Sequence, residues 1–149
     1  MSKQLLVTNE APDHGWLSLT IQSEGQSVFI DASDVPNNPM QELIGALEDA
    51  SRGREVYVWW NLEPDGFFMY LCPGSNEVSL RIESAPNSER ERGICVLEVT
   101  GTRQQVLLPL WRFVREFQSH GYQEPHWPAT DYGRMAEIKK NLEAAQDFK

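Results

Sequence analysis

The chain has 149 residues, of which 22 are acidic and 13 basic, giving a formal net charge of -9 at pH 7. A surface field of this sign repels phosphate groups, so it disfavours nucleic acid as a partner and favours a basic protein surface. Apolar residues make up 40% of the chain, yet no stretch approaches the roughly 20 apolar residues of a membrane-spanning helix. An acidic balance of this kind is also typical of soluble proteins in general.

The length predicts a single α+β domain spanning residues 1–149. The opening stretch MSKQLLVTNEAPDHG has one lysine and only a three-residue apolar run, which is too short for a signal peptide. We therefore expect a cytoplasmic location. Cys72 and Cys95 fall inside expected strands without a CxxC spacing, and we interpret them as buried free thiols.

Alternation and turn signals predict six strands, at residues 16–22, 27–33, 56–60, 67–72, 76–83 and 94–101. A first helix is expected over 38–53, with Asn38 as N-cap and Pro39 at the first helical position. A second is expected over 109–121, opened by its proline, and a third after a cap at residues 130–131. This order predicts an α+β fold in which one antiparallel meander sheet of about six strands packs against about three helices.

The stretch VYVWWNLEPDGFFMYL, residues 56–71, is apolar on both faces of the hairpin that it predicts. A six-residue connection pairs Trp60 with Phe67 on one face and leaves a second row of aromatic residues, the outer ladder, on the other. The outer ladder consists of Tyr57, Trp59, Phe68 and Tyr70. The main core should contain Trp60, Val58, Met69, Leu80, Leu43, Leu47 and Phe113.

Two interpretations of the outer ladder remain open. It is either a second buried face of the hairpin, or a partly exposed surface that binds another protein, since aromatic residues are enriched at interface hot spots. In the second case the carboxylates Glu63, Asp65 and Glu77 would rim the binding surface. A wider acidic patch could then include Glu83, Glu89, Glu91 and Glu98, diluted by Arg81, Arg90 and Arg92.

The search for catalytic and metal-binding motifs is negative. The chain has no GxSxG, GxxxxGK[ST], HExxH or GxGxxG pattern. His14, His120 and His126 fall in different loops without the short spacing of helical or turn metal sites. Glu63 and Asp65 could be imagined as an acid and base pair, but a turn rich in Pro, Asp and Gly explains them. We expect no catalytic residue, no metal and no cofactor.

The chain resembles the small acidic cytoplasmic immunity proteins of bacterial toxin and immunity systems, including contact-dependent inhibition. The resemblance rests on size, charge and the segments DASDVPNNPMQELIGALEDASRG, VYVWWNLEPDGFFMYL, LPLWRFVREF and HWP. It implies a protein that binds and blocks a cognate toxin, and it assigns no binding residue by position. The alternative is a small-ligand pocket protein or an unrecognised enzyme, in which the outer ladder lines a cavity under the helices.

Overall fold

The structure, a computed structural model, describes residues 5–144 apart from the side chain of Glu91. Residues 1–4 of the stretch that was tested for a signal peptide lie outside this range. The strands are β1 (Leu6–Asn9), β2 (Trp16–Ser23), β3 (Gln26–Ser33), β4 (Val56–Asn61), β5 (Gly66–Pro73), β6 (Val78–Ala85) and β7 (Ile94–Gly101). The helices are α1 (Pro39–Ser51), α2 (Arg103–His120) and α3 (Met135–Ala144), with a short 3-10 helix, η1 (Arg90–Arg92), before β7.

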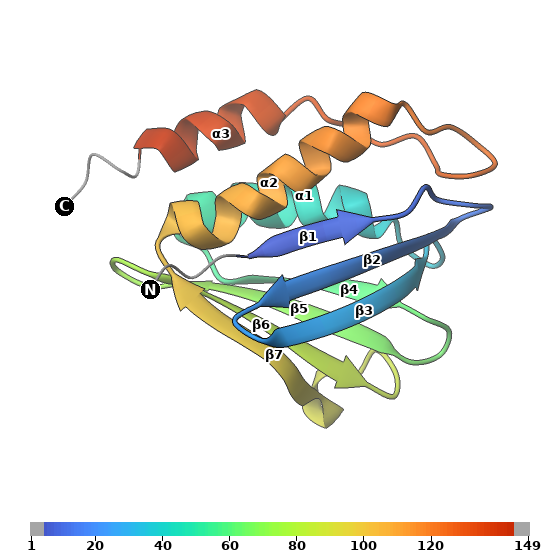
Figure 1. The fold of residues 1–149 in the computed structure, drawn as a ribbon, viewed down its shortest axis with the longest axis horizontal. Helices are drawn as coiled ribbons and strands as arrows, with labels where there is room; N and C mark the ends of the chain where they lie inside the picture. The colour runs from blue at the N-terminus through green and yellow to red at the C-terminus, as the bar shows by residue number, and fades with distance from the viewer. Residues whose placement is uncertain (1–4, 145–149) are drawn as a thin grey trace.

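The strands form two antiparallel sheets, with strand orders β1-β2-β3 and β4-β5-β6-β7 (Figure 1). The α+β class is confirmed, but the prediction of one sheet of about six strands is wrong. The six predicted strands all form, and β1 is a seventh that the sequence analysis missed because it is only four residues long. Alternation identifies strands but does not reveal which of them pair across a sheet.

One side chain joins the facing edges of the two sheets. The Gln26 side-chain amide donates to the backbone oxygen of Glu98 at 3.0 Å and accepts from its backbone N–H at 2.9 Å. The Gln26 side chain thus makes the two hydrogen bonds to β7 that the backbone of a neighbouring strand would make. It links β3 to β7 without backbone pairing between the two strands. Among the described residues the two sheets are therefore packed together without a shared backbone ladder.

The hairpin at the centre of the sequence has the predicted register. Trp60 pairs with Phe67, and the outer-ladder pairs are Tyr57 with Tyr70 and Trp59 with Phe68. A two-residue hairpin turn joins β2 to β3, and Glu24 and Gly25 both take the positive φ values that it requires, 49° and 81°.

The first helix begins as predicted, whereas the other two begin elsewhere. Asn38 accepts hydrogen bonds from two backbone N–H groups of the first turn of α1. The α2 helix starts six residues before Pro109, because Thr102 and Gln105 form a capping box and the proline lies inside the helix. The α3 helix starts at Met135, so the cap predicted at residues 130–131 is wrong.

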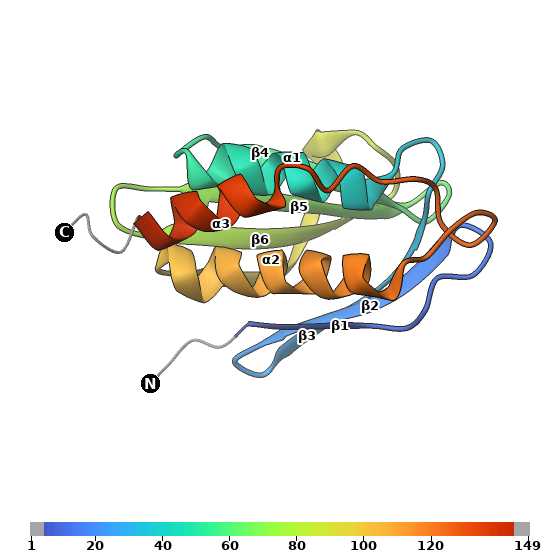
Figure 2. The same cartoon turned by 90° about the horizontal axis from the view of Figure 1, so that it is seen from above.

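One continuous core joins both sheets to the helices. In Figures 1 and 2, α2 lies lengthwise between the β1–β3 sheet on one side and α1 and α3 on the other, and it contacts β6 and β7 of the four-stranded sheet. The predicted core is confirmed, since each member is at least 97% buried: Val58, Trp60, Met69, Leu80, Leu43, Leu47 and Phe113. In the described part of the chain no helix combines the length and apolar character needed to cross a bilayer.

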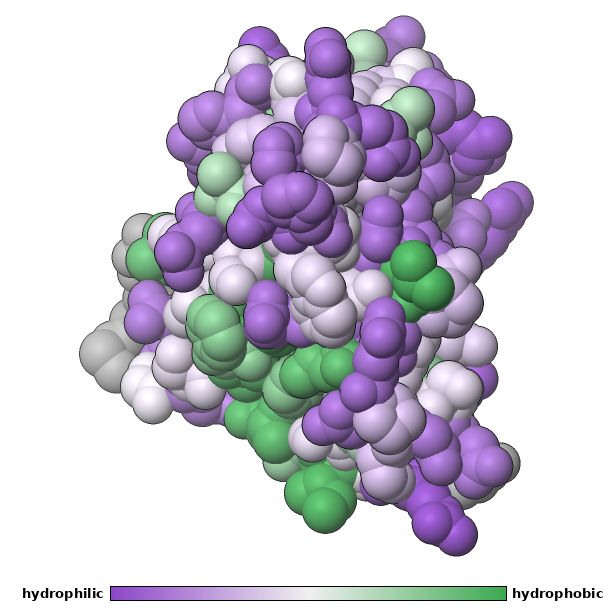
Figure 3. Space-filling model, turned by 90° about the vertical axis from the view of Figure 1, so that its right-hand side faces the viewer, coloured by the Kyte–Doolittle hydropathy of each residue, from purple (hydrophilic) through white to green (hydrophobic). Residues whose placement is uncertain are grey.

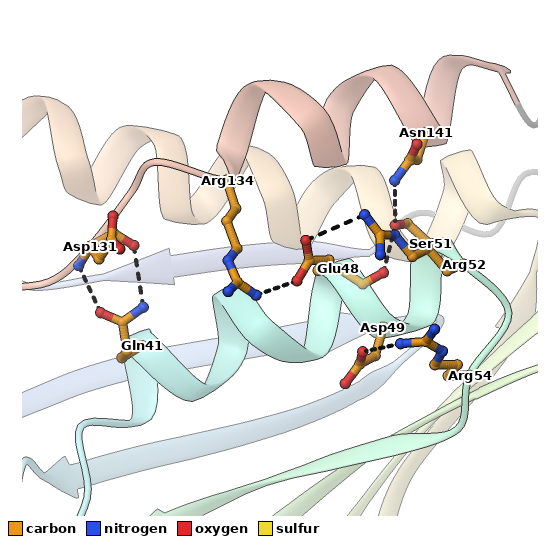
Figure 4. Close-up of polar contacts among 9 residues, drawn as sticks. All are labelled: Gln41, Glu48, Asp49, Ser51, Arg52, Arg54, Asp131, Arg134 and Asn141. Carbon is orange, nitrogen blue, oxygen red and sulfur yellow. Dashed lines mark hydrogen bonds and ion pairs between the residues drawn. The ribbon is translucent and has the colours of Figure 1, made fainter.

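Polar contacts hold the C-terminal segment on α1, as Figure 4 shows. The Gln41 side chain makes two hydrogen bonds to the backbone of Asp131, at 2.7 and 3.2 Å. Two turns further along, Glu48 pairs with both Arg134 and Arg52. These contacts and the buried apolar face of α3 close the helix layer on the inner side of the four-stranded sheet.

Candidate partner-binding surface

The outer ladder lies on the face of the four-stranded sheet that is opposite the helices. Inward side chains such as Val58 and Trp60 belong to the main core, whereas Trp59, Phe68 and Ala85 form a separate buried cluster against which Tyr70 packs. The ladder therefore does not line a cavity under the helices. If the chain were a small-ligand pocket protein or an enzyme, a ligand that contacts the ladder would have to bind on the sheet face that is opposite the helices.

The ladder is covered at one end and open at the other. Trp59 is 8% exposed and Phe68 only 1%, while Tyr57 is 42% exposed and Tyr70 is half-buried. The interpretation as a second buried face thus applies to one end of the ladder, and the interpretation as an exposed binding surface applies to the other. The Trp59 end is a small second core, and only the Tyr57 end offers aromatic surface to a partner.

Residues of the sheet bury one another at the closed end of the ladder, where the Trp59 and Phe68 rings lie 4.6 Å apart, and a loop runs beside them. The Asn37 side chain donates to the backbone oxygen of Trp59 at 3.0 Å, and Asn61 donates to that of Val35 at 2.6 Å. These bonds hold the loop before α1 beside β4. The Trp59 ring also lies against Gly66, where an added Cβ would be 2.6 Å from a ring carbon. A side chain at Gly66 would displace the tryptophan.

Arg90 of η1 stacks on both tyrosines of the open end. Its guanidinium carbon lies 4.4 Å from the ring centroid of Tyr57 and 5.3 Å from that of Tyr70. Its Nε also donates to the Tyr70 hydroxyl at 3.4 Å. Stacking of this kind contributes about 0.5–1 kcal/mol at exposed sites, so it positions the loop without closing the surface.

A hollow beside these rings, the tyrosine groove, gives the surface its shape. It has two adjoining parts of about 260 and 390 Å³. The residues that line them are Glu55, Val56, Tyr57, Tyr70, Cys72, Arg81, Glu83 and Arg90. The groove is therefore aromatic on its floor and charged at its sides.

The charges around the tyrosine groove are partly paired. Arg81 contacts Glu83 at 2.6 Å and Glu98 at 3.9 Å, whereas Glu55 forms no ion pair with any described residue. An aromatic floor beside carboxylates suits a lysine or arginine side chain, which gains both ring stacking and charge pairing.

The predicted rim of carboxylates does not surround this groove. Glu63 and Asp65 lie in the β4–β5 turn, whereas Glu77 lies in the β5–β6 turn at the opposite end of β5. The sequence analysis missed Glu55 as a groove residue. Arg90 was expected only to dilute an acidic patch, yet its guanidinium covers both tyrosines.

Both cysteines are free, but the prediction that they are buried is wrong. Cys95 is exposed because the β7 register shifts at a bulge opposite Ile82 and Glu83, and Cys72 is half-buried at the groove. Burial raises the pKa of the Cys72 thiol, and the nearby Glu55 carboxylate raises it further.

A second exposed apolar region lies near the other sheet. Phe29 of β3 is 58% exposed, and Ile94 and Val96 of β7 are exposed as well. Figure 3 shows apolar side chains gathered in the lower half of the face that it presents. No described aromatic or cationic group stacks on Phe29, which makes it a useful comparison for Tyr57.

Comparisons with protein-family models, with curated proteins and with solved structures each found no match.

Proposed function

We propose that this chain is a cytoplasmic binding protein that recognises and neutralises a basic toxin domain, as immunity proteins do. The observation that carries the proposal is the tyrosine groove, a solvent-open aromatic floor flanked by carboxylates on a protein with a net charge of -9. Tyrosine and arginine are the residues that most often anchor protein interfaces, and a basic partner is attracted by the overall field.

The expected contact is a lysine or arginine of the toxin lying against Tyr57 and beside Glu55. Both groups are exposed, and Glu55 has no ion-pair partner among the described residues, whereas on the Tyr57 ring the toxin's cation would take the place of Arg90. The buried end of the ladder acts as the rigid support beneath this contact, because Phe68 packs edge-on against Tyr57 at 5.6 Å. A rigid aromatic anchor loses little conformational entropy on binding.

The test is to produce the chain with the product of the reading frame beside its own, and to titrate the purified pair in a calorimeter. Tyr57→Ala should weaken binding by about 2 kcal/mol, roughly 30-fold, as expected for truncation of a hot-spot residue. Phe29→Ala is the matched control, since it also removes an exposed aromatic side chain from a strand. It should leave the affinity unchanged.

Two results would contradict the proposal. If Phe29→Ala weakens the complex and Tyr57→Ala does not, the partner uses the other sheet. If the chain binds the neighbouring product but leaves its toxic activity intact, the chain is not an immunity protein. Growth of cells that produce the toxin, with and without this chain, measures the second point directly.

A further inference from the structure

Two loops distant in sequence bring Asp13, His14 and His126 together at the surface. The His14 Nδ1 lies 2.6 Å from Asp13 Oδ1, and the His126 Nδ1 lies 3.4 Å from the same oxygen. One potential ligand atom from each residue lies within 4.8 Å of the other two. Sequence spacing predicted no metal site, but spacing cannot show that these loops meet.

Backbone hydrogen bonds fix the loops that carry the cluster. The Gly15 N–H donates to the backbone oxygen of His126 at 2.9 Å, and the Asp34 N–H donates to the oxygen of Gly15 at 2.8 Å. Asp13 pairs with Trp16 through two further backbone bonds, at 2.9 and 3.1 Å. The three candidate ligands therefore project from backbone that is already ordered, which reduces the entropy lost on binding an ion.

A buried tryptophan anchors the second loop. Trp127, which follows His126, is 1% exposed and packs edge-on against Phe117 of α2, with ring centroids 5.8 Å apart. The position of His126 is thus set by the core, although its own side chain is about half exposed. His120 lies on the last turn of α2 and stacks on Tyr122 instead, outside the cluster.

The His126 Nδ1 faces the cluster. It accepts a hydrogen bond from the His14 backbone N–H at 3.3 Å, and an ion bound at this nitrogen would take the place of that hydrogen bond. The neighbouring carboxylate is 78% exposed, as is 71% of the His14 side chain. Both can turn toward an ion without disturbing the core.

We propose that Asp13, His14 and His126 bind one divalent transition-metal ion of the zinc class, with the remaining coordination position open to solvent. Imidazole nitrogens combined with a carboxylate oxygen suit Zn²⁺, Ni²⁺ and Cu²⁺. Bonds of about 2.0–2.1 Å place neighbouring ligand atoms of a tetrahedral ion about 3.3 Å apart. The separation of 3.4 Å between His126 Nδ1 and Asp13 Oδ1 already fits this geometry.

The proposal is tested by calorimetric titration of the untagged full chain with ZnCl2. The parent should bind one ion per chain, and His14→Ala and His126→Ala should each weaken binding by about tenfold or more. His120→Ala is the matched control and should bind as the parent does. A Cys72→Ser, Cys95→Ser double variant should also bind unchanged, which separates this site from thiol binding.

A second measurement does not depend on variants that might lose their fold. Zn²⁺ should shift the imidazole NMR signals of two histidines and leave those of the third, His120, in place. The proposal is overturned if the parent binds no Zn²⁺, if binding is lost only in the cysteine variant, or if all three histidines respond equally. The last result would indicate scattered surface binding, and the short Asp13–His14 contact would then be an ordinary surface ion pair.

Discussion

Replacement of Trp59 by alanine should destabilise the protein far more than replacement of its ladder neighbour Tyr57. A tryptophan buries about 150–250 Å² in a core. At about 25 cal/mol per Å² this corresponds to roughly 4–6 kcal/mol. Trp59 retains 8% exposure and lies in a small cluster that can partly collapse, so we expect Trp59→Ala to cost about 3–4 kcal/mol. Tyr57 is 42% exposed, and Tyr57→Ala should cost about 1–2 kcal/mol.

Urea denaturation followed by far-ultraviolet circular dichroism measures both values without relying on tryptophan fluorescence. The dependence of the unfolding free energy on urea concentration should be the same in both variants, since a change would mean that the unfolded state or the two-state behaviour had changed. If Trp59→Ala costs no more than Tyr57→Ala, the cluster of Trp59, Phe68 and Ala85 is not a second core. The division into a buried end and an open end would then be refuted.

Three further predictions concern the core, the sheet junction and the thiols. Leu47→Ala should cost about 2–5 kcal/mol in urea denaturation, because Leu47 is fully buried. Gln26→Ala removes both hydrogen bonds to Glu98, and we expect a loss of about 1–2 kcal/mol together with faster hydrogen exchange of the Glu98 amide. A thiol reagent in limited amount should modify Cys95 before Cys72, because Cys95 is exposed and the pKa of Cys72 is raised by burial; peptide mass spectrometry distinguishes the two.

Features set by neighbouring residues in the chain were predictable. The hairpin register follows from the length of one connection, and the start of α1 follows from Asn38 and Pro39. The α2 boundary was missed although its signal was present, because Pro109 was interpreted as a helix opener. A proline does break the hydrogen-bond pattern of a helix interior, but the capping box and the buried face of α2 outweigh that cost.

Features that depend on contacts between distant segments were not predictable from one sequence. In the sequence Gln26 is an ordinary residue beside a turn, and its hydrogen bonds to Glu98 form only because the fold places β7 next to it. His14 and His126 are 112 residues apart in the sequence, and their loops meet through the docking of Trp127 and the backbone hydrogen bond from Gly15 to His126. Arg90 likewise belongs to a charged loop whose composition predicts solvent exposure, yet its guanidinium stacks on Tyr57 and Tyr70.

The position of Arg90 explains how one aromatic ladder can be partly buried and still offer an accessible surface to a partner. A flat row of four aromatic residues, fully open to water, would expose a large apolar patch and favour aggregation. Trp59 and Phe68 are buried against each other and Ala85, while Arg90 covers the tyrosines with a charged group that water can still reach. A cationic side chain thus already lies on the tyrosine groove in the free protein. A basic partner that docks there would replace one cation on the rings by another, so binding would not require the groove to open.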